Sequence, residues 1–232
     1  NNWEINSDKI AGNNVNYSFP SSGKKLVKLI TVSNRNCTDS IMDTVKVFHL
    51  PVGEIIAENH CFDDSISITS NIFNEDTIKS YAWNLSDGSK ESESSFQYRF
   101  ADTGTYTLSL LLQNQHRCYN TLNSSIRVNS KPLSSFRLQN ICLGDTAYFQ
   151  DSSLLAMGSI SSYNWYVNGV LLSSDQSVSY YPKSSGNYQV KQVITSDSGC
   201  KDSAFQELNV FSIEDVNFNV LGNCQNDTIY FN

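Results

Sequence analysis

The stretch Tyr81-Ala82-Trp83-Asn84-Leu85 places large apolar side chains at alternate positions, and it returns 82 residues later as Tyr163-Asn164-Trp165-Tyr166-Val167. Such alternation is typical of a β-strand with one buried face. A third tryptophan, Trp3, precedes both. A glycine follows each tryptophan after 20 or 21 residues, and a cysteine follows each glycine after 14: Gly23 and Cys37, Gly104 and Cys118, Gly186 and Cys200. The period of about 80 residues indicates a tandem array of small domains.

Aligning the repeats divides the chain into four pieces. Residues 1–51 carry the later part of one repeat, residues 52–132 and 133–212 each carry a complete repeat, and residues 213–232 match only the opening strands of another. Pro51 and Pro132 end strands and stiffen short joints. Because the first and last pieces are partial, we expect them to have sheet edges that need partners. Other residues of a longer protein would fill those edges, or the tail Val216–Asn232 of one molecule would donate strands to residues 1–51 of another.

Within a repeat the apolar period is two residues, which predicts strands. One face of a predicted strand carries Tyr106, Leu108, Leu110 and Leu112, and the other carries Thr107, Ser109 and Gln113. Short strands separated by polar turns predict an all-β fold, with tandem Ig-like sandwiches of two sheets.

Tryptophan and tyrosine mark the predicted core of each sandwich. Trp3, Trp83 and Trp165 are expected to bridge the two sheets, because so large a ring is seldom left outside a small core. The competing interpretation is a platform on which a carbohydrate ring stacks. Tyr106 and Tyr188 each follow a glycine by two residues. This spacing predicts tyrosine corners, in which the hydroxyl bonds to the backbone.

Composition disfavours several classes of function. The net charge of −7 argues against a nucleic-acid partner, because phosphate binding needs clustered Lys and Arg. No run approaches the roughly 18 consecutive apolar residues of a membrane-spanning helix, so we expect no membrane insertion. Six cysteines at periodic positions indicate an oxidising compartment and therefore a secreted protein.

No catalytic motif is visible in the sequence. There is no Gly-x-Ser-x-Gly, His-Glu-x-x-His or phosphate-binding glycine loop, and no nucleophile matches His49, His60 or His116. We therefore predict a non-enzymatic protein without a cofactor. A zinc site that uses His60 and His116 is disfavoured, because the third repeat has no matching histidines. Carboxylates such as Asp87 fall short of the roughly six to eight oxygen ligands that calcium prefers.

The second repeat resembles the polycystic-kidney-disease (PKD) family of Ig-like domains. The resemblance rests on Trp83-Asn84-Leu85-Ser86-Asp87-Gly88, then Phe96-Gln97-Tyr98-Arg99-Phe100, then Gly104-Thr105-Tyr106. The third repeat departs from this pattern at Trp165-Tyr166-Val167-Asn168-Gly169. The first keeps Trp3 but lacks the acidic-Gly turn. The family implies an Ig-like sandwich, whereas function at this level is analogy.

Two cysteine signatures are similar to tandem PKD arrays of Bacteroidetes surface proteins, including gliding-motility adhesins exported by the type IX route. They are Cys142-Leu143-Gly144-Asp145-Thr146 and Gly199-Cys200-Lys201-Asp202-Ser203. This resemblance implies an extracellular, cell-surface location. It also implies neighbouring repeats of the same long chain as partners, with other surface or secretion-system proteins as further ones.

Seven Asp-Ser/Thr-apolar triplets resemble the O-glycosylation motif of such surface proteins. An equally good interpretation is that Asp-Thr simply opens a strand. The triplets begin at Asp39, Asp43, Asp64, Asp76, Asp145, Asp202 and Asp227.

A second cysteine series lies 24 residues after the first and consists of Cys61, Cys142 and Cys224. In an Ig-like sandwich this series lies near A–B turns, whereas Cys37, Cys118 and Cys200 lie near F–G turns at the opposite end. A bond within one repeat would cross a strand length of roughly 17–20 Å, but the Cα atoms of a disulfide lie within about 7 Å.

End-to-end stacking of the domains brings the A–B turn of one repeat to the F–G turn of the next, which favours Cys61–Cys200. By the same rule the other four cysteines would bond to residues outside this chain. Side-by-side packing would instead favour the pairs that are 24 residues apart.

Two functions from different classes follow. The leading hypothesis is a structural stalk segment of a long secreted cell-surface adhesin, which spaces a distal binding tip from the cell. The alternative is a carbohydrate- or protein-binding accessory module of a secreted enzyme. A stalk predicts no deep pocket, whereas a binding module predicts an exposed aromatic platform.

Overall fold

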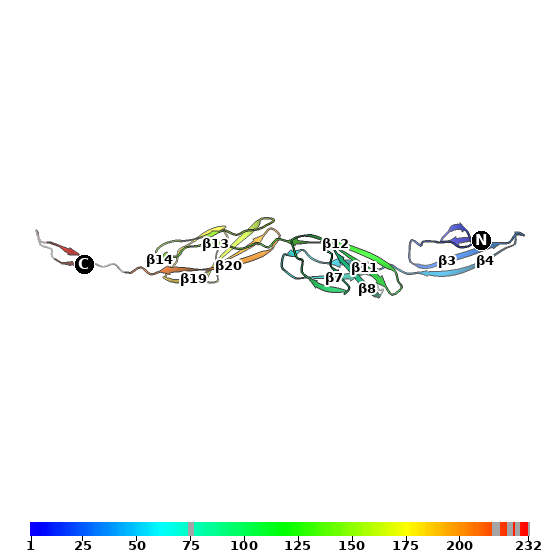
Figure 1. Cartoon of the computed structure of the whole chain (residues 1–232), viewed down its shortest axis with the longest axis horizontal. Coiled ribbons are helices and arrows are strands. Elements are labelled where there is room, and N and C mark those ends of the chain that lie inside the picture. The colour runs from blue at the N-terminus through cyan, green and yellow to red at the C-terminus, as the bar shows by residue number, and fades with distance from the viewer. Residues whose placement is uncertain (74–76, 215–218, 222–224, 226–227, 232) are drawn as a thin grey trace. The chain divides into compact units, whose positions relative to one another are not determined.

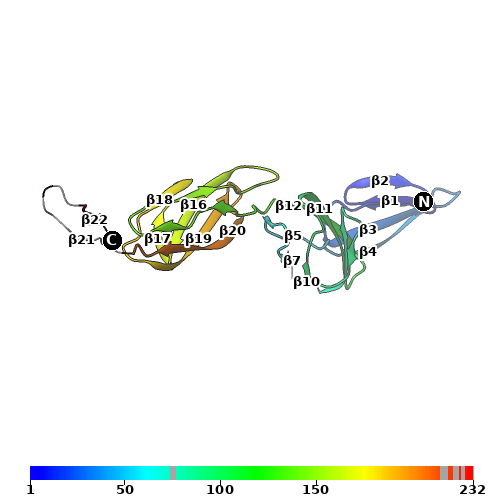
Figure 2. The same cartoon turned by 60° about the vertical axis from the view of Figure 1, so that its left-hand side comes forward.

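The computed structural model describes residues 1–73, 77–214, 219–221, 225 and 228–231, and these contain strands and turns but no helix. Among them, therefore, no helix has the length and apolarity to cross a membrane. The chain forms two compact units. The first comprises Asn1–His60 and Asp64–Val128, and the second Cys61–Asp63 and Asn129–Asn232. Figures 1 and 2 show that strands build both units, which confirms the all-β prediction.

The first unit begins with a four-stranded antiparallel sheet in the order β2-β1-β3-β4. Its strands are β1 (Asn2–Ile5), β2 (Asp8–Ala11), β3 (Gly23–Val32) and β4 (Thr38–Val47). The long β3–β4 hairpin dominates this sheet (Figure 1).

A sandwich of two sheets completes the first unit. The three-stranded sheet has the order β10-β7-β5, and the five-stranded sheet has the order β6-β12-β11-β8-β9. The strands are β5 (Gly53–Ile56), β6 (His60–Cys61), β7 (Ile66–Ile72), β8 (Ile78–Leu85), β9 (Lys90–Glu91), β10 (Ser95–Tyr98), β11 (Gly104–Asn114) and β12 (Tyr119–Asn129). Alternate residues of the facing strands fill the core, and Trp83, Ile68, Leu108 and Leu110 are at most 1% exposed.

The second unit contains a sandwich of the same design, in the orders β13-β15-β18 and β14-β20-β19-β16-β17. The strands are β13 (Phe136–Arg137), β14 (Ile141–Cys142), β15 (Ala147–Asp151), β16 (Ile160–Val167), β17 (Val170–Ser173), β18 (Ser177–Tyr180), β19 (Gly186–Ser196) and β20 (Lys201–Phe211). Trp165 is fully buried, with its ring centroid 5.0 Å from that of Phe136 and 5.9 Å from that of Phe149. A separate two-stranded ribbon joins β21 (Val220–Leu221) to β22 (Tyr230–Phe231).

The hydrogen-bonding register recurs in all three long hairpins. Gly23 pairs with Val47, Gly104 with Val128, and Gly186 with Val210. On the neighbouring strand Trp3 lies opposite Leu29, Trp83 opposite Leu110, and Trp165 opposite Gln192. The sequence period is therefore a period of strand pairing, and β1 to β4 correspond to β8, β9, β11 and β12.

Trp3 differs from the other two tryptophans in its burial. It was expected to be a core residue, but it is only half-buried, whereas Trp83 and Trp165 are at most 1% exposed. The reason is that residues 1–51 form one sheet and contain no strands equivalent to β5 and β7. The local geometry is nevertheless the same. The indole N–H donates to a backbone carbonyl in each case: Trp3 to Gly12, Trp83 to Glu93 and Trp165 to Asp175, at 2.9–3.1 Å.

Both complete sandwiches contain a tyrosine corner. The hydroxyl of Tyr106 donates to the carbonyl oxygen of Asp102 at 3.0 Å, and that of Tyr188 donates to the carbonyl oxygen of Ser184 at 2.8 Å. Both rings are half-buried. Each bond ties the chain entering the long hairpin to the strand that follows.

Candidate functional site

The F–G turns of the three repeats, which join β3 to β4, β11 to β12 and β19 to β20, share one backbone geometry. In residues 33–37, 114–118 and 196–200, the first residue donates its N–H to the carbonyl oxygen of the closing cysteine, at 2.8–3.1 Å. The side-chain oxygen of that first residue accepts the cysteine N–H in return. The acceptors are Ser33 for Cys37 (3.1 Å), Asn114 for Cys118 (2.9 Å) and Ser196 for Cys200 (3.1 Å). Each F–G cysteine is thus presented by the same turn.

The fourth residue of each turn has a left-handed backbone. Its φ is 60° at Asn36, 64° at Arg117 and 85° at Gly199. A Cβ added at Gly199 would meet no atom within 4 Å, so the backbone conformation, and not crowding, favours glycine there. The same conformation is adopted with three different residues, which shows that the turn is set by its hydrogen bonds.

The A–B cysteines also have a common setting. Cys61 ends β6 and Cys142 ends β14. In each case the next residue donates its N–H to the carbonyl oxygen of the last residue of a long strand: Phe62 to Asn129 of β12 and Leu143 to Phe211 of β20, both at 2.8 Å. Both cysteines are therefore held beside the end of a long strand.

One disulfide is formed among the described residues, between Cys61 and Cys200, which lie 139 residues apart with Cα atoms 5.6 Å apart. It is the pair that the sandwich topology favours. Both cysteines belong to the second compact unit, although the sequence register places Cys61 in the second repeat and Cys200 in the third. The bond therefore joins the opening of one repeat to the F–G turn of the next.

The remaining described cysteines are free thiols. Cys37 and Cys142 are exposed and Cys118 is half-buried, and Cys224 lies outside the described residues. In the structure no bond joins Cys118 to Cys142, the alternative pair 24 residues apart.

Polar side chains beside the F–G turn hold the linker that enters the second repeat. The amide Nδ2 of Asn114 donates to the carbonyl oxygen of His49 at 3.0 Å, and Nδ2 of Asn120 donates to that of Pro51 at 2.7 Å. The ring of Phe48 stacks on that of His116, with centroids 3.6 Å apart. This joint lies within the first unit.

In the third repeat the residue at the position of Asn120 also holds the incoming linker. Asp202, the equivalent of Asn120, accepts the backbone N–H of Ser134 at 2.7 Å. In both complete sandwiches, therefore, the incoming linker is held by the residue that lies two positions after the F–G cysteine. This role was not predicted from the sequence, although the polar residue recurs after each cysteine.

His49 has a partner that sequence spacing did not signal. Its Nδ1 lies 2.8 Å from Oγ of Ser22, which is 27 residues away. A nucleophilic serine also requires a third group that orients the base, and it requires hydrogen-bond donors for the oxyanion. The pair is exposed and joins the turn before β3 to the linker.

The acidic turn after β8 is organised around Asp87. Its carboxylate accepts the backbone N–H of Ser89 at 3.0 Å and the hydroxyl of Tyr98 at 2.8 Å. Partial burial opposes ionisation, but these hydrogen bonds outweigh it and lower the pKa of the Asp87 carboxyl. Across the described part of the chain, no three or more His, Cys, Asp or Glu side chains are grouped to hold a metal ion.

The Asp-Ser/Thr triplets lie mostly on strands or at their starts. Ser40 and Thr44 are exposed on β4, and in both triplets the aspartate accepts the N–H of the next residue, at 2.8 and 2.7 Å. Asp76 and Asp227 lie outside the described residues.

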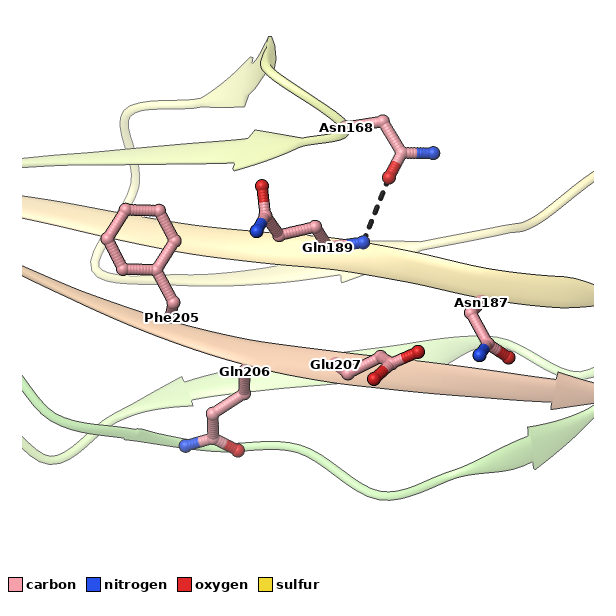
Figure 3. A pocket seen from close by; sticks show the side chains of 6 residues that line it. All are labelled: Asn168, Asn187, Gln189, Phe205, Gln206 and Glu207. Carbon is pink, nitrogen blue, oxygen red and sulfur yellow. Dashed lines mark hydrogen bonds between the residues drawn. The ribbon is translucent and has the colours of Figure 1, made fainter.

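A shallow polar hollow of about 500 Å³ opens on the sandwich of the third repeat (Figure 3). Its lining residues are Asn168, Asn187, Gln189, Phe205, Gln206 and Glu207. Gln189 of β19 lies directly opposite Glu207 of β20, and Asn168 accepts the N–H of Gln189 at 2.9 Å. Phe205 is 55% exposed, and Nζ of Lys191 lies 5.1 Å from the centroid of its ring.

The sandwich of the second repeat has a different surface at the same positions. Where the third repeat has Gln189, Phe205 and Glu207, the second repeat has Thr107, Asn123 and Ser125. The hollow is therefore a property of the third repeat and not of the shared scaffold. It was not predicted from the sequence, although the loss of the small residues at these outward positions is visible when the two repeats are aligned.

Several solved structures are similar to this chain over part of its length. The chain is similar to the fibronectin(III)-like modules of Clostridium thermocellum CbhA, with 13% identity over 72% of this chain and 98% of that one, at a TM-score of 0.44. It is also similar to the PKD1 domain of Vibrio anguillarum Epp, with 26% identity over 37% of this chain and 99% of that one, at a TM-score of 0.34. A third similar structure is the PKD1 domain from the Vibrio cholerae metalloprotease PrtV. It has 26% identity over 35% of this chain and 98% of that one, at a TM-score of 0.33.

No curated protein matches the sequence at a significant level. A family model does match: residues 50–130 fit that of the PKD domain. This match covers the second repeat, in which the sequence resemblance is fullest. The chain is thus an all-β protein of tandem Ig-like β-sandwich repeats, whose residues 50–130 match the PKD domain model.

Proposed function

We propose that this chain is a stalk segment of a long secreted cell-surface adhesin. The observation that carries the proposal is the Cys61–Cys200 bond, because it links consecutive repeats through turns whose geometry recurs along the chain. A load-bearing spacer needs such a covalent link, whereas a flexible tether does not. The disulfide suits an extracellular location, and the match to the PKD domain model fits a structural or adhesion-type module.

The recurring turns extend the proposal to the free cysteines. Cys118 has the F–G setting of Cys200, and Cys142 has the A–B setting of Cys61. In a longer array each would bond the complementary cysteine of the adjacent repeat. The partners of the segment are then its neighbouring repeats, with other surface or secretion-system proteins contacting the parent adhesin. The resemblance to Bacteroidetes gliding-motility adhesins and the type IX export route belongs to this proposal.

Stretching single molecules from both ends tests the mechanical role. The bond shields the chain between Cys61 and Cys200, a sequence separation of 139, from the applied force. The oxidised chain should therefore lengthen less on unfolding than the reduced chain, by about 470 Å at roughly 3.4 Å per residue. A Cys142→Ser variant, which keeps the bond, is the control. Equal lengthening before and after reduction would show that the bond carries no load.

The hollow on the third sandwich favours a second candidate, an accessory module that binds carbohydrate. An exposed aromatic ring flanked by amide and carboxylate groups is suited to stacking a sugar ring and bonding its hydroxyls. A glycan array probed with the whole chain tests this idea. Binding that is lost in Phe205→Ala but kept in the second-repeat control Asn123→Ala would support it, and an array without a bound glycan would reject it.

A further inference from the structure

The outer face of the three-stranded sheet in the third repeat carries two exposed aromatic rings. Tyr148 lies on β15, the central strand, and is 70% exposed, whereas its neighbours Ala147 and Phe149 are at most 1% exposed in the core. Tyr181 follows directly after β18 and is 60% exposed. Because Pro182 comes next, the backbone of Tyr181 is restricted to the extended region and continues the alternation of β18. Both tyrosines therefore face solvent on the same side of the sheet.

The strand register makes the two tyrosines diagonal neighbours. Tyr148 pairs with Ser179, and Tyr181 lies two positions beyond Ser179. Diagonal neighbours on one face of an antiparallel pair lie roughly 7–8 Å apart. Two rings at this separation form one platform, on which successive parts of an extended ligand can lie.

Two shallow hollows flank β15 on this face. One, of about 400 Å³, lies toward β13, and its lining includes Arg137, Tyr148 and Gln150. The other, of about 420 Å³, lies toward β18, and its lining includes Tyr148, Gln150, Ser177 and Ser179. Because the hollows share Tyr148 and Gln150, the tyrosine stands between two depressions that carry amide, hydroxyl and guanidinium groups.

The polar side chains of this face are available to a ligand. Within the described part of the chain, Arg137, Gln150, Tyr148 and Tyr181 form no side-chain hydrogen bond or ion pair with another protein group. Arg137 also carries the only charge among the described residues that line the two hollows. The face is thus positively charged, although the chain as a whole has a net charge of −7.

The second repeat has the same scaffold without the tyrosines. Ser67 pairs with Gln97 there, as Tyr148 pairs with Ser179 in the third repeat. At the position of Tyr181 the second repeat has Arg99. The sandwich therefore folds without aromatic residues at these two positions. Large rings that the fold does not need, exposed side by side, mark an interaction surface.

We infer that this face binds an acidic polysaccharide, with the rings of Tyr148 and Tyr181 stacked on its sugar rings and Arg137 paired with a uronate carboxylate. A tyrosine ring offers a flat apolar surface to the C–H groups of a sugar. The amide of Gln150 can bond sugar hydroxyls, and the planar guanidinium matches a carboxylate with two parallel hydrogen bonds.

Other polymers fit this face less well. A nucleic acid requires clustered cations along its phosphate backbone, whereas the two hollows contain Arg137 alone. A protein partner requires a buried apolar centre, whereas polar side chains surround the two rings here. The chemistry of the face therefore favours a sugar polymer that carries carboxylates.

This inference goes beyond the spacing role, because a stalk with such a face would adhere along its side as well as at its tip. It rests neither on the disulfide nor on the hollow at Phe205, which belongs to β20 of the five-stranded sheet. Its failure would leave both proposals of the preceding section standing.

Titration calorimetry of the whole chain tests the face. The probes are a β-linked mannuronate oligosaccharide and its carboxyl-reduced form, which is the neutral mannose oligosaccharide of the same length. Tyr148→Ala and Tyr181→Ala should each weaken binding of the uronate about tenfold, because each removes one stacked ring. Tyr148→Phe keeps the ring and should bind nearly as the unaltered chain does. Ser67→Ala, at the equivalent position of the second repeat, is the matched control and should change nothing.

The charge pairing has its own signature. Arg137→Gln should weaken binding of the uronate about tenfold and leave binding of the neutral oligosaccharide unchanged, because only the uronate has a carboxylate for the guanidinium. Arg137 is exposed on its strand. This variant therefore keeps the test valid even if Tyr148→Ala lowers the stability of the sandwich.

Four results would overturn the inference. They are the absence of binding to the uronate, an unchanged affinity in both tyrosine-to-alanine variants, binding that is lost in Phe205→Ala but kept in Tyr148→Ala, and displacement of the uronate by an equal concentration of single-stranded DNA. The third result would assign the sugar to the other hollow. The fourth would show that the face attracts any polyanion.

Discussion

The side-chain amide of Asn114 donates from Nδ2 to the carbonyl oxygen of His49 at 3.0 Å, across 65 residues of sequence. Its Oδ1 accepts the backbone N–H groups of His116 and Cys118, at 3.0 and 2.9 Å. Because Asn114 is only 1% exposed, water does not replace these bonds when the side chain is removed. One amide therefore holds both the F–G turn and the linker that enters the repeat.

Asn114→Ala should destabilise the first unit by about 2 kcal/mol, because it leaves part-buried backbone groups unsatisfied. Asn114→Ser should recover part of the loss, since Ser33 and Ser196 accept the equivalent cysteine N–H in the other turns. Urea unfolding curves measure both effects, with the exposed Gln115→Ala as the control. An unchanged midpoint for Asn114→Ala would contradict this role of the side chain.

The tryptophans should differ in energetic weight. Trp83→Ala or Trp165→Ala should cost about 3–5 kcal/mol, the usual range for deleting a buried aromatic ring. Trp3→Ala should cost clearly less, since its side chain is only half-buried. Denaturant titration of each variant makes the comparison. A Trp83 variant with full stability but altered glycan binding would instead favour a surface platform.

Removing the disulfide should destabilise the second unit. The bond closes 139 residues, and the chain-entropy relation gives about 5 kcal/mol for a loop of that length. The double variant Cys61→Ser, Cys200→Ser should therefore unfold at lower denaturant, whereas Cys142→Ser, at an exposed free thiol, should not. Equal shifts in the two variants would refute the prediction.

Stability should fall in acid partly through Asp87. Its pKa is lower in the folded protein, so its contribution is complete above the unfolded pKa of about 4 and is lost as pH falls through the folded value. The effect is small, because Asp87 is largely exposed despite its partial burial, and solvent screens the carboxylate. Asp87→Asn should flatten the pH dependence of the thermal midpoint below about pH 4. A profile that keeps its full acid slope would point to other carboxylates.

The architecture could be predicted from the sequence because its signals are local and repeated. The alternation around Trp83 and Trp165 predicts buried strands, and the glycine before Tyr106 predicts a corner that the structure contains. The spacing of cysteines, combined with sandwich topology, singled out Cys61 and Cys200. In each case one repeat served as a check on another.

Contacts between distant residues of different type could not be predicted in the same way. The role of Asn114 depends on the carbonyl of His49, and a backbone acceptor leaves no trace in the sequence. Half-burial of Trp3 reflects a missing layer and not a change in its own strand. The hollow around Phe205 arises from outward residues of two strands, and their proximity depends on register.

The span of the Cys61–Cys200 bond has a consequence for survival outside the cell. A protease that cuts the backbone once at any point between residues 62 and 199 leaves the two fragments covalently joined through the sulfur atoms. The long surface loop 152–159 in the sandwich of the third repeat falls inside this interval. A molecule nicked there keeps whatever it carries at its far end, and it is released only when the bond is reduced or a second cut falls outside the loop.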